Sequence, residues 1–369
     1  MKKFVCGFFL IFFVAQGLMF LRPPEEALLY ENRKAREFPS SLRFSTKGIK
    51  EFFRGVDGAF NDRMLAREQL VAANGFLAQL TGNIGDYNQA FNGRENWLFL
   101  GDNFNGSLEK LLGRPSAATS RMSNQYIKSV LAAAEQLKGP EIMVMVAPNK
   151  SAVYPEKLPR FMKPAAVRYS NAYVARLREA GLTIVDPLEA LKSAKPNQML
   201  YYRSDTHWNM AGAAVAFQAL LDQINSLNKY GRIDLPEFSL IPQPPFKGDL
   251  VAIGNFKQYQ AEDGDNFKLV WTDERPELTM IDQNGPGNLA HGDDLLSAKS
   301  GRAITVINPA AVSNLTVWFY HDSFGVSLAP FFHAVFAKTV HVERGDFGKL
   351  TPPGDPPDLV VLETVERYI

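Results

Sequence analysis

Apolar and polar positions alternate along most of this chain in patterns that predict strands and helices in turn. Residues 142–147 form an unbroken apolar run, which is typical of a strand buried on both faces of a sheet, and the mostly apolar residues 315–320 predict a second buried strand. Other short apolar runs predict strands at 96–100, 182–185, 339–342 and 359–362. Helical spacing of apolar residues predicts helices within 47–80, at 123–139 and 165–180, after residue 209 and at 327–337. This alternation implies an α/β fold with a mostly parallel sheet flanked by helices.

Residues 235–309 differ from the rest of the chain in composition and pattern. Pro and Gly are frequent here, and the short alternating stretches at 267–271 and 278–281 predict strands between loops. We therefore predict a loop and β-hairpin insertion in the α/β domain.

The first residues predict a membrane anchor. Lys2 and Lys3 precede an apolar run of 18 residues, Phe4 to Leu21, in which only Gln16 is polar. A run of this length is close to what a helix needs to cross a bilayer, whereas a cleaved signal peptide usually has a shorter apolar stretch ending in small residues. We expect an uncleaved signal-anchor whose lysines keep the N-terminus in the cytoplasm. The expected organisation is an anchor at 1–22, a stalk with N-terminal helices at 23–92 and a catalytic domain at 93–369.

Composition narrows the possible functions. Lys plus Arg is 40 and Asp plus Glu is 39, so the formal net charge of +1 gives no reason to expect a nucleic-acid partner. The only cysteine, Cys6, lies in the expected anchor, which excludes disulfides within the chain and a thiol mechanism. No glycine-rich nucleotide-binding signature is present, and we expect no cofactor.

Two polar segments follow expected strands or precede expected helices, where open α/β sheets place their active sites. Ser323 lies between the strand at 315–320 and the next helix, whose first N–H groups can stabilise an oxyanion. A serine hydroxyl needs a neighbouring base, and His207 is suited to that role, with Asp205 orienting its imidazole. The sequence therefore predicts a catalytic set of Ser323, His207 and Asp205.

Other roles for the polar residues stay open. His321 is two residues from Ser323 and competes with His207 as the base, while Asp322 is expected to shape the loop. His333 and His341 fall in a predicted helix and strand, where structural roles are more common. No third carboxylate or histidine stands at metal-ligand spacing beside Asp205 and His207, so no metal is expected.

The order of these motifs resembles that of a known family. An Asp-x-His-Trp motif at 205–208 precedes a helix, and a serine follows much later at a strand end. Residues 93–99, 147–155 and 365–367 resemble the family's entry strand, one of its strand-end turns and its C-terminal ending. Over about residues 45–369 the chain resembles the periplasmic polysaccharide O-acetyltransferases of the AlgJ/AlgX type and their DHHW relatives.

The resemblance implies an SGNH-hydrolase-like fold with a circularly permuted motif order, because ordinary members carry the serine first and the histidine last. The asparagine that usually donates to the oxyanion is missing from 362–366. The N–H groups of Ser323 and near Gly345, or the side chain of Arg344, are the candidate donors, and a surface salt bridge is the alternative for Arg344. The expected sugar-contacting residues are Trp208, Phe324 and Tyr202, with core packing as the alternative for Trp208 and Phe324.

The resemblance also implies an activity. Acetyl groups, supplied by a membrane-bound O-acyltransferase, would pass through an acetyl-serine to hydroxyls of an exopolysaccharide, alginate or a related polymer, in the periplasm. Other exopolysaccharide assembly proteins and the inner membrane are the further expected partners. Two alternatives remain: a carbohydrate acetylesterase, and a non-catalytic polysaccharide-binding or assembly protein that uses Trp208, Trp318 and Tyr201 as stacking surfaces.

Overall fold

The computed structural model describes residues 37–41, 44–62, 88–137, 139–256, 259–260, 264–291, 294–352 and 354–369. They belong to two compact units, one at 1–85 with 251–258 and the other at 86–250 with 259–369. In the first unit, helix α2 (Thr46–Asp62) confirms the first part of the helical prediction at 47–80. The expected anchor at 4–21 lies outside the described residues. Among the residues that are described, no helix is both long and apolar enough to cross a membrane.

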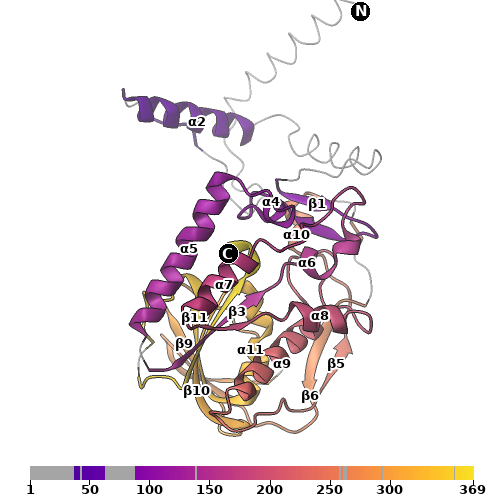
Figure 1. Cartoon of the computed structure of the whole chain (residues 1–369), viewed down its shortest axis with the longest axis vertical. Helices are drawn as coiled ribbons and strands as arrows, with labels where there is room; N and C mark the ends of the chain where they lie inside the picture. The colour runs from indigo at the N-terminus through magenta and orange to yellow at the C-terminus, as the bar shows by residue number, and fades with distance from the viewer. Residues whose placement is uncertain are drawn as a thin grey trace, which may run out of the picture. The chain divides into compact units, whose positions relative to one another are not determined.

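An eight-stranded sheet forms the core of the second unit, in the order β4-β3-β12-β10-β11-β9-β7-β8. Figure 1 shows part of this sheet, with β3, β9, β10 and β11 labelled. Five neighbouring strands are parallel: β4 (Thr183–Val185), β3 (Glu141–Ala147), β12 (Leu359–Val365), β10 (Ser313–His321) and β11 (Phe336–Glu343). The other three are antiparallel: β9 (Ala303–Ile307), β7 (Leu278–Asp282) and β8 (Gly285–Leu289). The predicted mostly parallel sheet is confirmed, and β10 runs through its middle.

Helices cover both faces of this sheet. Helices α5 (Ala117–Gln136) and α7 (Asn171–Glu179) pack on the face that carries Trp318, in one continuous apolar core. Side chains alternate between the two faces of a strand, so the next residue, Phe319, points the other way. There its ring stacks on Phe332 of α11 (Ala329–Val335), and Phe332 also contacts Phe217 of the largely buried helix α9 (Met210–Ser226).

The remaining elements are short. Strands β1 (Ala90–Asn92) and β2 (Leu98–Leu100) form a separate antiparallel pair. The short α-helices are α4 (Ser107–Leu111), α6 (Lys150–Val153), α8 (Leu188–Ala194) and α10 (Asp249–Ile253). The 3-10 helices are η2 (Pro155–Lys157), η3 (Ser323–Ser327), η4 (Arg344–Asp346) and η5 (Glu366–Tyr368).

The segment at 235–309 holds hairpins, as predicted, but only part of it stands apart from the sheet. Strands β5 (Phe238–Pro242) and β6 (Phe267–Trp271) form their own antiparallel pair. The β7–β8 hairpin and β9 instead extend the main sheet beyond β11. Leu278, Val306 and Ala329 form a small core beneath this extension, so the segment also covers an edge that the parallel strands would leave open.

Several predicted element boundaries were wrong. Helix α5 begins at Ala117 because Ser116, not Ser123, accepts the capping hydrogen bond, from the Thr119 N–H at 3.2 Å. Helix α7 begins at Asn171 instead of 165, and α11 gives way to β11 at Phe336 with no loop between them. Phe336 is fully buried and contacts Phe332, and apolarity alone does not separate the end of a buried helix from the start of a buried strand.

Candidate active site

Ser323 lies at the carboxyl end of β10 and begins the short helix η3. The preceding Asp322 shapes this turn, because its carboxylate accepts the N–H groups of Phe324 at 2.9 Å and of Val365 at 3.2 Å. Gly325 permits the turn, since a Cβ there would come within 2.4 Å of the His321 side chain. The result is a serine side chain exposed to solvent at the edge of the sheet.

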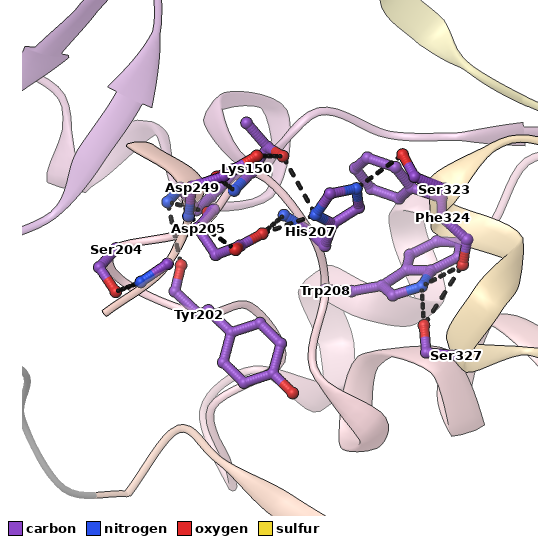
Figure 2. Close-up of polar contacts among 12 residues, drawn as sticks. Lys150, Tyr202, Ser204, Asp205, His207, Trp208, Asp249, Ser323, Phe324 and Ser327 are labelled. Atoms are coloured by element: carbon purple, nitrogen blue, oxygen red, sulfur yellow. Dashed lines mark hydrogen bonds and ion pairs between the residues drawn. The ribbon is translucent and has the colours of Figure 1, made fainter. Parts of the chain in front are cut away.

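His207 stands between Ser323 and Asp205 (Figure 2). Its Nε2 lies 2.8 Å from Ser323 Oγ, and its Nδ1 lies 2.6 Å from Asp205 Oδ1. The same carboxylate oxygen accepts the His207 backbone N–H at 3.0 Å. The structure thus brings together the three residues that the sequence singled out, although Ser323 is 116 residues away from His207.

Trp208 links the loop that carries His207 to the turn that carries Ser323. Its indole N–H donates to the Phe324 carbonyl at 3.0 Å and to Ser327 Oγ at 2.8 Å. Trp208 is 1% exposed and Phe324 is 0% exposed. The prediction that they contact a sugar ring is therefore wrong for this structure, and the core-packing alternative describes them.

Lys150 holds the loop that carries Asp205, a role that the sequence did not reveal. Its ammonium donates to the carbonyl oxygens of Tyr202, Arg203 and Asp205, at 2.9, 3.0 and 2.7 Å. Burial lowers the pKa of Lys150 to about 7, against the opposing effect of Asp205. Three acceptors around one nitrogen match the three donors of the charged ammonium. The available signal in the sequence was a lysine shortly after the buried strand β3, which ends at Ala147.

Asp249 also reaches the site, although the spacing argument found no third acidic residue there. Its carboxylate accepts the N–H of Thr206 at 2.8 Å and the Thr206 hydroxyl at 2.7 Å, and its own N–H donates to Asp205 Oδ2 at 3.0 Å. One ligand atom each from Asp205, His207 and Asp249 lie within 4.8 Å of one another. The prediction of no third ligand is corrected here, because the chain returns to this loop 44 residues later.

The pKa values of Asp205 and Asp249 are shifted in opposite directions. Burial opposes ionisation of Asp205, but its hydrogen bonds and the charge of His207 outweigh this and lower the pKa of Asp205 to about 2. Burial and the neighbouring charge of Asp205 raise the pKa of Asp249. Asp205 is therefore the ionised carboxylate that orients the His207 ring.

The candidate oxyanion donors have different surroundings. The Gly345 N–H donates to the Glu343 carboxylate at 2.6 Å, so it is engaged locally. The guanidinium of Arg344 stacks on the Tyr368 ring at 3.9 Å, and its Nε lies 3.7 Å from Asp322 Oδ2, in a partly buried ion pair and not a surface one. In the described part of the chain, the Ser323 N–H has no hydrogen-bond partner, and it is the donor that best fits an oxyanion.

Three aromatic residues and one histidine do not have the roles expected from the sequence. The Tyr202 ring packs edge-on against Phe246 with centroids 4.7 Å apart, turned away from Ser323 (Figure 2). Tyr201 and Trp318 are 0% and 4% exposed, which leaves no free face for stacking on a sugar. The His321 ring points into the protein toward His341, at 3.1 Å, so the alternative of His321 as base is wrong.

Arg367 is a further residue near the nucleophile that the sequence did not assign. Its guanidinium lies 5.5 Å from the centre of the Phe324 ring and 3.3 Å from Asn149 Oδ1. Lys110 donates to its carbonyl at 2.6 Å. The residues after β12 and β3 thus meet beside η3, at the carboxyl edge of the sheet.

This geometry defines a class: an α/β protein with a serine, a histidine and an aspartate at the carboxyl ends of parallel strands, typical of serine-dependent acyl chemistry. The family model described as "SGNH hydrolase-like domain, acetyltransferase AlgX" matches residues 90–306, more than half of the chain. The chain belongs to this family. The match includes Asp205 and His207 and ends before Ser323.

Individual relatives agree with this assignment. The chain is 24% identical over 298 residues to the "Probable alginate O-acetylase AlgJ" of Pseudomonas aeruginosa, covering 75% of this chain and 69% of that protein. It is 28% identical over 166 residues to the protein of the same name from Azotobacter vinelandii, covering 43% of this chain and 39% of that protein.

Solved structures share the fold. The O-acetyltransferase domain of Pseudomonas putida AlgJ has a TM-score of 0.51 at 19% identity, covering 76% of this chain and 91% of that one. Bacillus cereus PatB1 has a TM-score of 0.50 at 15% identity, covering 74% and 94%. The SGNH-hydrolase-like fold expected from the sequence is thereby confirmed.

Proposed function

We propose that this protein is a polysaccharide O-acetyltransferase whose nucleophile is Ser323. The observation that carries the proposal is the bridging position of His207, 2.8 Å from the hydroxyl of an exposed serine and 2.6 Å from a partly buried aspartate. This arrangement activates a serine for attack on an ester carbonyl.

The proposed reaction has two half-reactions. Ser323 Oγ attacks the acetyl carbonyl while His207 Nε2 takes the hydroxyl proton, and the tetrahedral oxyanion accepts the Ser323 N–H. The donor's C–O bond then breaks, its leaving oxygen receives the proton from His207, and acetyl-serine remains. In the second half, a sugar hydroxyl loses its proton to His207 and attacks the acetyl group, and the proton returns to Ser323.

The relatives support a carbohydrate acceptor. The Pseudomonas and Azotobacter proteins are named as probable alginate O-acetylases, and from them we extend to this chain an acceptor that is alginate or a related exopolysaccharide. A membrane-bound O-acyltransferase is the proposed source of the acetyl group. We also propose that the motif order arose by circular permutation, because Asp205 and His207 precede Ser323 along the chain.

Membrane attachment through residues 4–21 belongs to the same proposal. This apolar run carries no charge after Lys3, so we expect cell fractionation to find the protein in the inner membrane, with the domain at 93–369 accessible to protease from the periplasm. A chain whose first residue lies after position 17 or 21 would show instead that the segment is a cleaved signal peptide.

Transfer to sugar is expected to exceed hydrolysis. The purified protein is incubated with an activated acetyl ester and oligosaccharides of candidate polymers, and mass spectrometry records acetyl groups gained by the sugar. The gain should disappear in the Ser323→Ala and His207→Ala variants, because both half-reactions use these side chains.

Exposure of Ser323 also lets water reach an acetyl-serine, which favours an acetylesterase as the second candidate. Rapid hydrolysis of the ester, no acetylated sugar, and loss of acetyl groups from pre-acetylated oligosaccharides would establish that alternative. Absence of both reactions in the intact protein would support a binding role.

A further inference from the structure

A continuous line of buried polar contacts runs behind the nucleophile. Asp294 Oδ2 lies 2.9 Å from His333 Nδ1, and His333 Nε2 lies 2.8 Å from His341 Nε2. His341 Nδ1 lies 3.1 Å from His321 Nε2, and His321 Nδ1 lies 2.9 Å from the carbonyl oxygen of Asp322. These four side chains, Asp294, His333, His341 and His321, are 0–1% exposed. We call them the histidine array.

The contacts of the histidine array determine how many protons it must hold. Its four contacts involve all six ring nitrogens of the three imidazoles, and each contact needs one proton to be a hydrogen bond. Three neutral imidazoles supply only three protons. The carbonyl oxygen of Asp322 has none to give, so the contact with His321 Nδ1 is a hydrogen bond only if that nitrogen is protonated. A fourth proton is therefore required.

Charge balance favours the same count. The fourth proton belongs to the contact between His333 Nδ1 and Asp294 Oδ2, and an imidazole is more basic than a carboxylate, so the proton sits on the ring nitrogen. The opposite charges of the imidazolium and the carboxylate then balance each other in the buried pair. His291 does not change the count, because its Nδ1 is 3.9 Å from Asp294, beyond hydrogen-bond range.

The position of the charge follows from the surroundings. Burial, with a smaller contribution from His333, lowers the pKa of His321 to about 4. Burial and the charges of the other two histidines lower the pKa of His341 well below its ordinary value. These two imidazoles are therefore the neutral members, and the imidazolium falls on His333, beside the carboxylate.

We propose that His333 is an imidazolium paired with Asp294, and that its extra proton fixes His341 and His321 as Nδ1–H tautomers, so that His321 holds the carbonyl of Asp322. Every N–H beyond the ion pair then points the same way, from His333 to the nucleophile turn. Asp322 is already held through its N–H, which donates to Glu363 at 3.0 Å, and through its carboxylate. The Asp322 carbonyl also accepts the Gly325 N–H at 3.1 Å. The array adds a second donor to this oxygen, on the peptide bond that leads into Ser323, and its members are positioning residues.

The test counts protons directly. In protein labelled with ¹⁵N at histidine, NMR should find four protonated nitrogens among these three residues: Nδ1 of each, and Nε2 of His333. Three protonated nitrogens, or an Nε2–H tautomer at His321, would overturn the proposal. This measurement involves no catalysis, so its outcome is independent of whether the proposed acetyltransferase function is correct.

The functional consequence rests on the proposed function and needs a variant. His321→Phe keeps a ring that can stack on Phe319 but removes the Nδ1–H that holds the Asp322 carbonyl. We expect a fall in kcat of about tenfold or more with KM nearly unchanged, because a small displacement of the nucleophile slows chemistry more than binding. An unchanged kcat in a folded His321→Phe variant would show that the array does not position Ser323.

A matched control is Asp102→Asn. Asp102 is a partly buried aspartate whose carboxylate accepts the Glu109 N–H at 2.7 Å, in the α4 region. Its amide variant should keep both the kcat and the four-proton count. If His321→Phe does not fold, the proton count of the unaltered protein still decides the proposal.

Discussion

Replacing Ser323 with alanine is expected to lower the turnover of a small chromogenic acetate ester by about three orders of magnitude or more. Ser323 Oγ is the exposed atom 2.8 Å from His207 Nε2, and without it no acetyl-enzyme can form. The measurement is the steady-state rate of ester hydrolysis, with circular dichroism and thermal unfolding to show that the fold is kept. A variant that retained more than about a tenth of the activity would remove Ser323 from the mechanism.

Ser327→Ala is the matched control for this substitution. Ser327 lies in the same turn, and its hydroxyl accepts the Trp208 indole N–H at 2.8 Å. The Phe324 carbonyl still accepts that N–H at 3.0 Å after the change, so the turn should persist. We expect less than about a tenfold loss, in keeping with the modest net free energy of one hydrogen bond.

Asp205→Asn is expected to reduce kcat by about 10³- to 10⁴-fold, as in other serine–histidine–aspartate sites. Asp205 Oδ1 accepts both the His207 Nδ1–H and the His207 backbone N–H. An amide group turned toward Nδ1 would donate instead, which places the ring proton on Nε2 and leaves no acceptor for the Ser323 hydroxyl. The pKa of Asp205 is about 2, so the carboxylate charge is present across the neutral range and the loss should not depend on pH there.

Asp249→Asn distinguishes this mechanism from a metal site built on the same loop. Asp249 accepts two hydrogen bonds from Thr206, and an asparagine can keep one of them, so a triad predicts a loss no greater than about tenfold. If Asp205, His207 and Asp249 were instead ligands of an ion, both variants would lose similar activity and a chelator would inactivate the enzyme. That pattern would contradict the role of Asp205 proposed here.

The parts of the fold that could be predicted are those governed by local pattern. The apolar run that became β3 and the mostly apolar residues at the buried end of β10 could be read directly as strands. The boundary between α11 and β11 could not, because Phe332 and Phe336 are equally buried on the two sides of it. Ser123 resembled a helix cap, but it is fully buried within α5, and the identity of the true cap depends on which turn packs against the sheet.

The candidate site could likewise be predicted only in part. Asp205, His207 and Ser323 were found from residue type and position beside predicted strands or helices. Lys150 and Asp249 were missed because their contacts to the loop join residues 43 to 55 positions apart, and no periodicity records such pairings. Trp208 and Phe324 were identified as important but given the wrong task, since aromatic character alone does not tell a buried clamp from a surface platform.

The two outermost strands of the sheet bear on how this protein behaves at high concentration. An exposed strand edge presents unpaired N–H and C=O groups that can recruit a strand from another molecule. At one side the last strand, β4, is only three residues long. At the other, β8 contains Pro286 between Gly285 and Gly287, which removes one donor and weakens the preference for extended backbone. Neither border offers a long run of backbone partners, so the sheet can end in solvent at both sides with little tendency to aggregate through strand addition.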